Sequence, residues 1–203
     1  MDKKIRANFY IDGNFIYHIH LYSTKHVEVT IDWDELQHFL QNKISEEENK
    51  PCVIKSQFFV GTETKSSAEE REFLFNSMEH AGIKKNATHL KRNNSGKLKE
   101  DGVDTNLVFR ATKDYYENSE QQYDYFILCA GDSDFLPLIK GLKNEAVKIC
   151  LIYLNCNDDE LGVTKTSKEL FKNSDIQINL EDLLSNEKLF KRHINVDLVN
   201  KTA

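Results

Sequence analysis

The sequence predicts a single α/β domain, built on a parallel sheet of about five to six strands with helices on both faces. Apolar, strand-like runs alternate with amphipathic helical segments along the chain, and two of these runs end directly in acidic turns. The 203 residues, 39% of them hydrophobic, suffice for one sizeable core. We expect a domain spanning residues 1–186 and a basic C-terminal tail spanning residues 187–203.

Six runs rich in β-branched or aromatic residues are predicted to form the strands. In chain order they are Ile5–Ile11, Val53–Val60, Ala87–Leu90, Tyr125–Ala130, Val147–Leu154 and Ile176–Leu180. Helical segments occupy the intervals between them, which favours parallel pairing of the strands. The polar stretch Glu46–Lys50 is expected to be a loop.

Capping residues and apolar side chains at helical spacing predict four helices in these intervals. Asp32 and Ser67 are the expected N-caps of the first two, and Gly82 closes the second. A third helix begins at Asp104. The fourth carries Pro137 in its first turn, where a missing N–H costs little.

The bulk composition indicates a soluble, cytoplasmic protein. Charged residues make up 30% of the chain and the mean hydropathy is -0.58. No apolar run reaches the roughly 18 residues of a membrane span, and the start of the sequence has no signal-peptide pattern. The four cysteines show no Cys-x-x-Cys spacing, so we expect reduced thiols.

The charge distribution bears on nucleic acid as a partner. The net charge of -6 at first argues against a polyanion. Between Lys84 and Lys99, however, the chain carries six basic residues and no acidic one. Such a strip can hold a phosphate backbone. The alternative is a solvated basic loop, because the stretch Asn93–Gly96 within it is rich in turn-forming residues.

Acidic motifs occur where strands end or helices begin. Asp12-Gly13-Asn14 follows the first predicted strand, Gly131-Asp132-Ser133-Asp134-Phe135 follows the fourth, and Asp101-Gly102-Val103-Asp104 opens a helix. The carboxyl ends of parallel strands line the crevice where open α/β sheets bind ligands. Carboxylates that share such a pocket require protons or a hard cation, and their oxygens suit Mg²⁺ or Mn²⁺. We therefore expect a metal-dependent acidic site for phosphate chemistry.

Each motif also has a purely structural interpretation. Asp-Gly-Asn is a common turn sequence, and Asp104 could serve only as a helix N-cap. In the third motif, Asp132 is expected to project from the strand end while Asp134 either caps the following helix or binds metal. Three separated carboxylates at strand ends or helix starts make capping alone the poorer explanation.

Several segments, in this order, resemble the NYN domain, a PIN-like nuclease group that includes LabA-like proteins. The resemblance extends from about Arg6 to Leu180, and its most specific part is Gly-Asp-Ser-Asp-Phe. The segments that carry it are Ile11-Asp12-Gly13-Asn14, Lys99 with Gly102-Val103-Asp104, Ala130–Leu138, and Ser167-x-x-Leu170 with Asp175. It implies a Rossmann-like PIN fold, a Mg²⁺ or Mn²⁺ site and ribonuclease activity on single-stranded or structured RNA.

The same match implies roles for individual residues. Asp12, Asp104 and Asp132 would be catalytic, metal-binding carboxylates, and Asp134 either an additional ligand or a group that contacts the ligands. A metal-activated water would then attack the phosphodiester, with no protein nucleophile. The expected substrate-binding residues are Asn14, Arg92, Lys97, Lys99, Arg110, Ser133 and Ser167. Thr164 and Thr166 are further hydroxyl candidates at the mouth of the site.

Arg110 marks a departure from the family pattern, because many similar chains carry an acidic residue at this point of the helix. Arg110 could contact phosphate, or its presence could weaken metal binding and leave an RNA- or protein-binding module that does not cleave. Asp114 would compensate only if its side chain points back to the pocket. A phosphatase with an Asp-x-Asp motif is disfavoured because that motif comes late in this chain. No motif indicates a particular oligomer, so a homodimer is left open.

Overall fold

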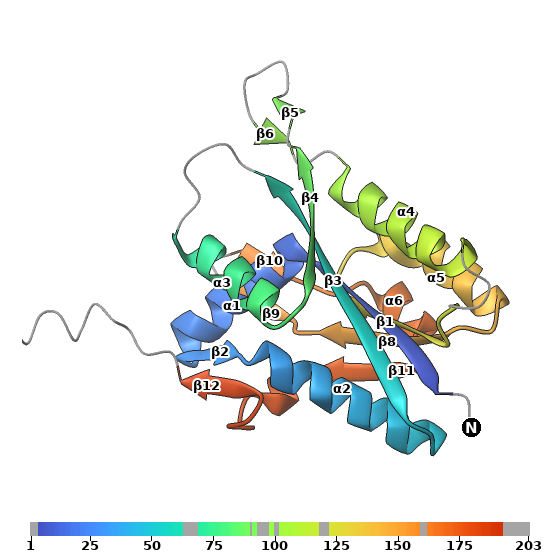
Figure 1. Ribbon diagram of the computed structural model, residues 1–203. Helices are drawn as coiled ribbons and strands as arrows, with labels where there is room; N and C mark the ends of the chain where they lie inside the picture. Colours follow the sequence, from blue (N-terminus) through green and yellow to red (C-terminus); the bar gives the residue numbers. More distant parts are fainter. Residues whose placement is uncertain are drawn as a thin grey trace, which may run out of the picture.

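A computed structural model describes residues 4–62, 69–89, 91–92, 98–99, 102–117, 122–158 and 162–192 of the chain. Its centre is a six-stranded sheet with the order β11-β8-β7-β1-β3-β4, in which every neighbouring pair is parallel (Figure 1). The strands are β1 (Ile5–Asp12), β3 (Cys52–Thr62), β4 (Lys84–His89), β7 (Tyr125–Cys129), β8 (Lys148–Tyr153) and β11 (Ile176–Asn179). The predicted parallel α/β sheet is confirmed.

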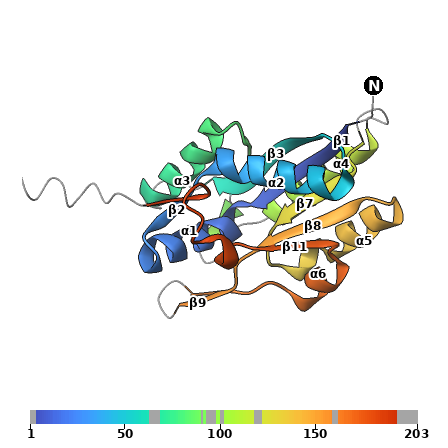
Figure 2. The same cartoon turned by 90° about the horizontal axis from the view of Figure 1, so that it is seen from below.

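Helices cover both faces of this sheet. They are α1 (Gly13–His26), α2 (Trp33–Glu48), α3 (Glu69–His80), α4 (Val103–Tyr116), α5 (Leu136–Asn144) and α6 (Lys168–Asn173), with 3-10 turns η2 (Ser133–Phe135) and η3 (Glu181–Leu183). Helices α1, α2 and α3 share one core with one face of the sheet, and α4, α5 and α6 share another core with the opposite face. Figure 2 shows α5 and α6 across the sheet from α2 and α3.

Side-chain alternation along β1 separates the two cores. Phe9 and Ile11 point into the core of α1, α2 and α3, whereas Tyr10 lies in the core of α4, α5 and α6. All three side chains are fully buried. A central strand that is apolar on both faces is typical of a doubly covered parallel sheet.

The capping predictions are partly confirmed. Asp32 caps α2 by accepting a hydrogen bond from the Glu35 N–H at 3.0 Å, and Pro137 lies in the first turn of α5. Gly82 follows α3 with a φ of 75°, a left-handed conformation that glycine adopts without strain. Ser67, the expected cap of α3, lies outside the described residues.

Two predictions about helix ends are wrong. The N-cap of α4 is Gly102, with a φ of 92°, so Asp104 lies in the first turn of the helix instead of capping it. The predicted loop Glu46–Lys50 is helical as far as Glu48. Tertiary contacts account for this extension, because the Glu48 carboxylate accepts a hydrogen bond from the Tyr125 hydroxyl and pairs with Lys148.

In the described part of the chain, three short antiparallel ribbons flank the sheet. Their strands are β2 (Val29–Ile31) with β12 (Phe190–Arg192), β5 (Lys91–Arg92) with β6 (Leu98–Lys99), and β9 (Cys156–Asp158) with β10 (Gly162–Thr164). Through β12, the beginning of the basic C-terminal segment is paired into the fold. Leu189 and Phe190 are buried in the core with α1, α2 and α3.

Burial also determines the protonation state of the cysteine thiols. Cys52, Cys129 and Cys150 are free and buried. Burial raises the pKa of the Cys52 thiol to about 11 and that of Cys150 to about 12, so both are protonated at neutral pH. Of the described helices, none combines the length and the apolar character needed to cross a membrane.

Asp175 contacts both β8 and α5, the helix that precedes this strand. Its Oδ1 pairs with Lys143 Nζ at 2.8 Å, and its Oδ2 accepts a hydrogen bond from the Ile149 N–H at 2.8 Å. Partial burial acts to raise the pKa of Asp175, but the bonds from Lys143 and Ile149 outweigh it and hold the pKa below its usual range. This part of the NYN-like sequence pattern is therefore explained by a structural contact.

We predict that Asp175→Asn lowers the free energy of unfolding by about 1 kcal/mol at pH 7, a value reduced for partial exposure of the pair. A lowered folded-state pKa contributes stability that is present above the unfolded-state pKa of about 4 and lost as the pH falls through the folded-state value. Urea denaturation from pH 7 to pH 3 should therefore show the two proteins converging in acid. The exposed Asp182→Asn is the control, and a gap that stays constant with pH would contradict this role.

Candidate active site

Asp12 and Asp132 lie at the same edge of the sheet. Strands β1 and β7 are adjacent and parallel, with Ile11 opposite Cys129, so the residues that follow these positions emerge together at the carboxyl edge. Asp12 is the last residue of β1 and also caps α1. Its Oδ1 accepts hydrogen bonds from the Asn14 N–H at 2.9 Å and the Phe15 N–H at 3.3 Å.

Asp132 has the equivalent position after β7. Its Oδ1 accepts hydrogen bonds from the Asp134 N–H at 3.0 Å and from the Ser133 hydroxyl at 3.4 Å, so Asp132 is the N-cap of η2. Of the two roles expected for Asp134, a helix cap or a metal ligand, the structure does not show the cap, because α5 begins at the end of η2 with no side-chain cap. Both aspartates thus hold their carboxylates through bonds to the backbone of the following turn.

These residues line one cavity of about 450 Å³. Six of the residues proposed from the sequence contribute to its wall, namely Asp12, Asn14, Asp132, Ser133, Thr166 and Ser167. The remaining lining residues are Phe15, His18, Gly131 and Lys165. His18 lies one helical turn after Asn14 on α1, a spacing that could have assigned it to the same face. Lys165 had no comparable signal in the sequence.

Gly131 is required by close packing at the floor of this cavity. A Cβ atom at this position would lie 2.6 Å from Phe15 Cε2 and 2.8 Å from the Lys165 carbonyl oxygen. The Gly131 carbonyl oxygen also accepts a hydrogen bond from the Ser167 N–H at 2.9 Å. The absence of a side chain therefore lets the segment 165–167 pack directly against the end of β7.

Thr166 brings a buried hydroxyl to the wall of the cavity. Its N–H donates to Asn155 Oδ1 at 2.8 Å, which fixes its backbone. Its Oγ1 is buried and has no hydrogen-bond partner in the described part of the chain. A buried polar atom without a partner is costly unless a ligand satisfies it.

The donor atoms around the cavity fit a hard divalent cation. Asp12 and Asp132 provide carboxylate oxygens, Asn14 an amide oxygen, and Thr166 a hydroxyl oxygen. Mg²⁺ and Mn²⁺ prefer such oxygen ligands. Within the described residues, no three His, Cys, Asp or Glu side chains gather closely enough to hold an ion by themselves.

Two predicted carboxylates stand outside the wall of this cavity. Asp134 lies on η2 and Asp104 in the first turn of α4, and neither lines the cavity. The two elements are nevertheless neighbours, because Val103 and Leu107 of α4 share a core with Phe135 of η2. Asp104 and Asp134 therefore belong to elements that pack together at this end of the fold.

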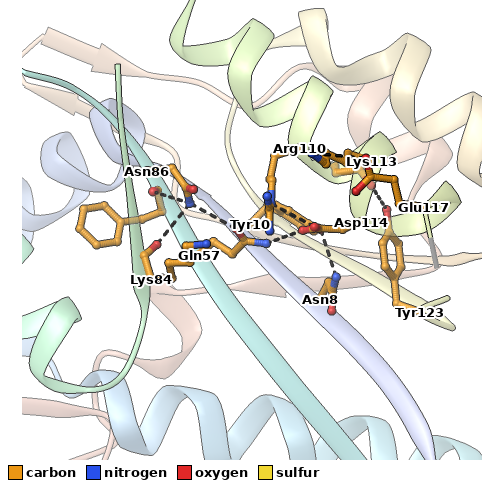
Figure 3. A network of polar contacts seen from close by, with 12 residues as sticks. Asn8, Tyr10, Gln57, Lys84, Asn86, Arg110, Lys113, Asp114, Glu117 and Tyr123 are labelled. Atoms are coloured by element: carbon orange, nitrogen blue, oxygen red, sulfur yellow. Dashed lines mark hydrogen bonds and ion pairs between the residues drawn. The ribbon is translucent and has the colours of Figure 1, made fainter. Parts of the chain in front are cut away.

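Arg110 lies in a different cavity from Asp12 and Asp132. Its Nε pairs with Asp114 Oδ1 at 3.0 Å, and both residues line a second cavity of about 640 Å³. Asp114 does not point back to the acidic site, since its Oδ2 accepts hydrogen bonds from the Tyr10 hydroxyl at 2.9 Å and from Gln57 Nε2 at 2.6 Å (Figure 3). Asp114 thus does not replace the acidic residue expected at Arg110.

The predicted basic strip falls largely outside the described residues. Arg92 and Lys99 have their backbones paired in the β5–β6 ribbon, Arg92 with Leu98 and Lys99 with Lys91. Their side chains, and all of Lys97, lie outside the described part of the chain. The side chain of Thr164 lies outside it as well.

A parallel sheet covered by helices on both faces is a Rossmann-like α/β architecture, and Asp12 and Asp132 lie at its carboxyl edge. The model of the NYN domain family matches residues 9–181, and the chain belongs to this family. NYN domains are generally nucleases, and they usually use divalent metals. No curated protein and no solved structure shows a significant match to the chain.

We predict that Gly131→Ala lowers the free energy of unfolding by about 1–3 kcal/mol, because its Cβ would overlap Phe15 and the backbone at Lys165. The matched control is Gly141→Ala in α5, where a Cβ would meet nothing within 4 Å. This control should be neutral or stabilising, since alanine is the better helix former. Thermal unfolding compares the two, and equal melting temperatures would show that the packing at Gly131 is not required.

Proposed function

We propose that the protein is a metal-dependent ribonuclease that hydrolyses RNA phosphodiester bonds at the cavity between the ends of β1 and β7. The observation that carries the proposal is the convergence of Asp12 and Asp132 on one cavity that also contains the unpartnered hydroxyl of Thr166. Membership in the NYN family supports the same reaction class. We infer Mg²⁺ or Mn²⁺ from the oxygen donors.

In this proposal, the carboxylates of Asp12 and Asp132 hold the cation, with oxygen atoms of Asn14 and Thr166 nearby. Asp104 and Asp134 add negative charge at the rim from α4 and η2. A bound divalent cation lowers the pKa of a coordinated water and stabilises charge on the leaving oxygen. Its presence removes the need for a protein nucleophile.

Other side chains of the cavity suit the binding of an RNA phosphate. Lys165 supplies a positive charge, and Ser133 and Ser167 supply hydroxyl donors. The basic residues Arg92, Lys97 and Lys99 precede α4 in the chain and are proposed to guide the RNA backbone toward Asp104. We do not extend this role to Arg110, because it lines the other cavity.

A second candidate function is RNA binding without cleavage. This function is favoured because the wall of the cavity contains two carboxylates, those of Asp12 and Asp132, which is few for a catalytic metal site. The position of Arg110, paired to Asp114 elsewhere, points the same way, because neither residue adds a carboxylate to the site. Metal uptake and turnover distinguish the two functions.

We predict that the purified protein cleaves RNA with Mn²⁺ or Mg²⁺ and stops when the metal is chelated. Asp12→Asn and Asp132→Asn should each lower the rate by at least about 100-fold, because each removes a metal-binding charge. Asparagine caps helices nearly as well as aspartate, so the fold should persist. Gel-based cleavage of single-stranded and duplex RNA and DNA measures the rate and the substrate class.

Asp182→Asn, an exposed aspartate on η3, is the charge-matched control and should cleave like the original chain. If the variants at Asp12 and Asp132 keep full activity, the proposed site is wrong. If the original chain binds RNA and metal but never cleaves, the binding function replaces the enzymatic one.

A further inference from the structure

The second cavity lies at the opposite, amino-terminal end of the sheet. It is lined by the first halves of β1 and β3 and by the last turns of α4. The cavity forms where the sheet narrows, because β4 begins at Lys84, opposite Gln57 of β3. Before Gln57, the outer edge of β3 has no strand partner among the described residues, and the space beside it is open. Its volume of about 640 Å³ is that of a small-molecule site.

A network of polar side chains lies at this end of the sheet (Figure 3), and its members Asn8, Gln57 and Asp114 line the cavity. Asn8 Nδ2 donates to the Tyr10 hydroxyl at 3.1 Å, and the Tyr10 hydroxyl donates to Asp114 at 2.9 Å. Gln57 Nε2 donates to the same carboxylate at 2.6 Å, and Asn86 Nδ2 donates to Gln57 Oε1 at 3.2 Å. Each bond orients the side chains that it joins.

The hydroxyl of Tyr10 stays protonated in this network. Burial, together with the neighbouring Tyr123 and Asp114, raises the pKa of Tyr10 far above its ordinary value. The hydroxyl therefore remains protonated and continues to donate to Asp114. Since Arg110 also pairs with Asp114, the charge of this partly buried carboxylate is compensated without a ligand.

The network leaves hydrogen-bonding capacity that faces the cavity. Asn8 and Gln57 are each more than nine-tenths buried, and both line the cavity. Asn8 donates one of its two Nδ2 protons to Tyr10, and its Oδ1 accepts no hydrogen bond from the described residues. Gln57 donates one of its two Nε2 protons to Asp114. The two amides therefore leave an acceptor on Asn8 and donor protons on both residues, and amide groups of this kind bind the edges of nucleobases.

The outer wall of the cavity is basic, in contrast to the net charge of -6 of the whole chain. Five basic side chains line the cavity, whereas only two acidic side chains, those of Asp114 and Glu117, do so. Asp114 pairs with Arg110, and Glu117 pairs with Lys113. Lys55 and Lys84 have no ion-pair partner among the described residues. Two unpaired ammonium groups at the mouth of a polar cavity favour a ligand that carries a phosphate.

We propose that this cavity binds a nucleoside monophosphate. The base contacts Asn8 and Gln57 on the inner wall, and the phosphate contacts Lys55 and Lys84 at the mouth. A base with an exocyclic amino group, such as adenine, matches the free acceptor of Asn8. The site is separate from the proposed ribonuclease centre, because Asn8 precedes Asp12 by four residues, or roughly 13 Å along β1.

The experiment is calorimetric titration of the full chain with AMP, adenosine or inorganic phosphate, in the presence of EDTA. AMP should bind at least about tenfold more tightly than either fragment, because it alone fills both walls of the cavity. Lys55→Gln combined with Lys84→Gln should weaken AMP binding at least about tenfold. Lys140→Gln, which removes a charge from the exposed face of α5, should leave the affinity within about twofold.

A second variant locates the site. Asp12→Asn combined with Asp132→Asn should bind AMP as the original chain does, whether or not that chain cleaves RNA. The proposal is overturned if AMP does not bind at millimolar concentration, if phosphate or adenosine alone binds as tightly, or if the aspartate variant loses binding while the lysine variant keeps it. Because EDTA excludes catalysis, failure of the ribonuclease proposal leaves this test unaffected.

Discussion

The parallel pairing of β1 with β7 is the constraint on which the candidate site depends. The two strands are far apart in the sequence, and their register brings Asp12 and Asp132 to one edge of the sheet. Each aspartate then caps the turn that follows, so its carboxylate is held by backbone N–H groups before any ligand binds. The same bonds that begin α1 and η2 thereby orient the proposed metal ligands.

Much of the fold could be predicted because most of its six central strands contain apolar runs that are separated by amphipathic helices. The edge strand β4, Lys84–His89, is largely polar, so the run Ala87–Leu90 located it without giving its start. The errors have tertiary causes. The helix α2 continues through polar residues because Tyr125 and Lys148, distant in the sequence, bind Glu48. Asp132 rather than Asp134 caps the next element because the chain first makes the 3-10 turn η2. The ribbon strands are too short to produce a periodic pattern.

The part of the candidate site that lies in the turns after β1 and β7 could be predicted from the sequence. Asp12, Asn14, Asp132 and Ser133 belong to turns after apolar runs, Ser167 belongs to the segment that resembles the NYN domain, and all five line one cavity. The spacing of residues in the sequence did not show how α4 is oriented relative to the sheet. Asp114 lies ten residues after Asp104, or roughly 15 Å along the helix, which carries it to the opposite end of the sheet. Thr166 was a hydroxyl candidate from the sequence, but only the structure shows that its Oγ1 is buried without a hydrogen-bond partner among the described residues.

The pairing of β12 with β2 links the last described strand of the chain to its tryptophan. The Asp32 N–H donates to the Leu189 carbonyl oxygen at 2.8 Å, and the adjacent Trp33 is buried in the same core as Leu189 and Phe190. Trp33 is the single tryptophan of the sequence. Its fluorescence therefore reports whether the C-terminal strand is docked, and a fusion or truncation that displaces this strand will expose the indole to water.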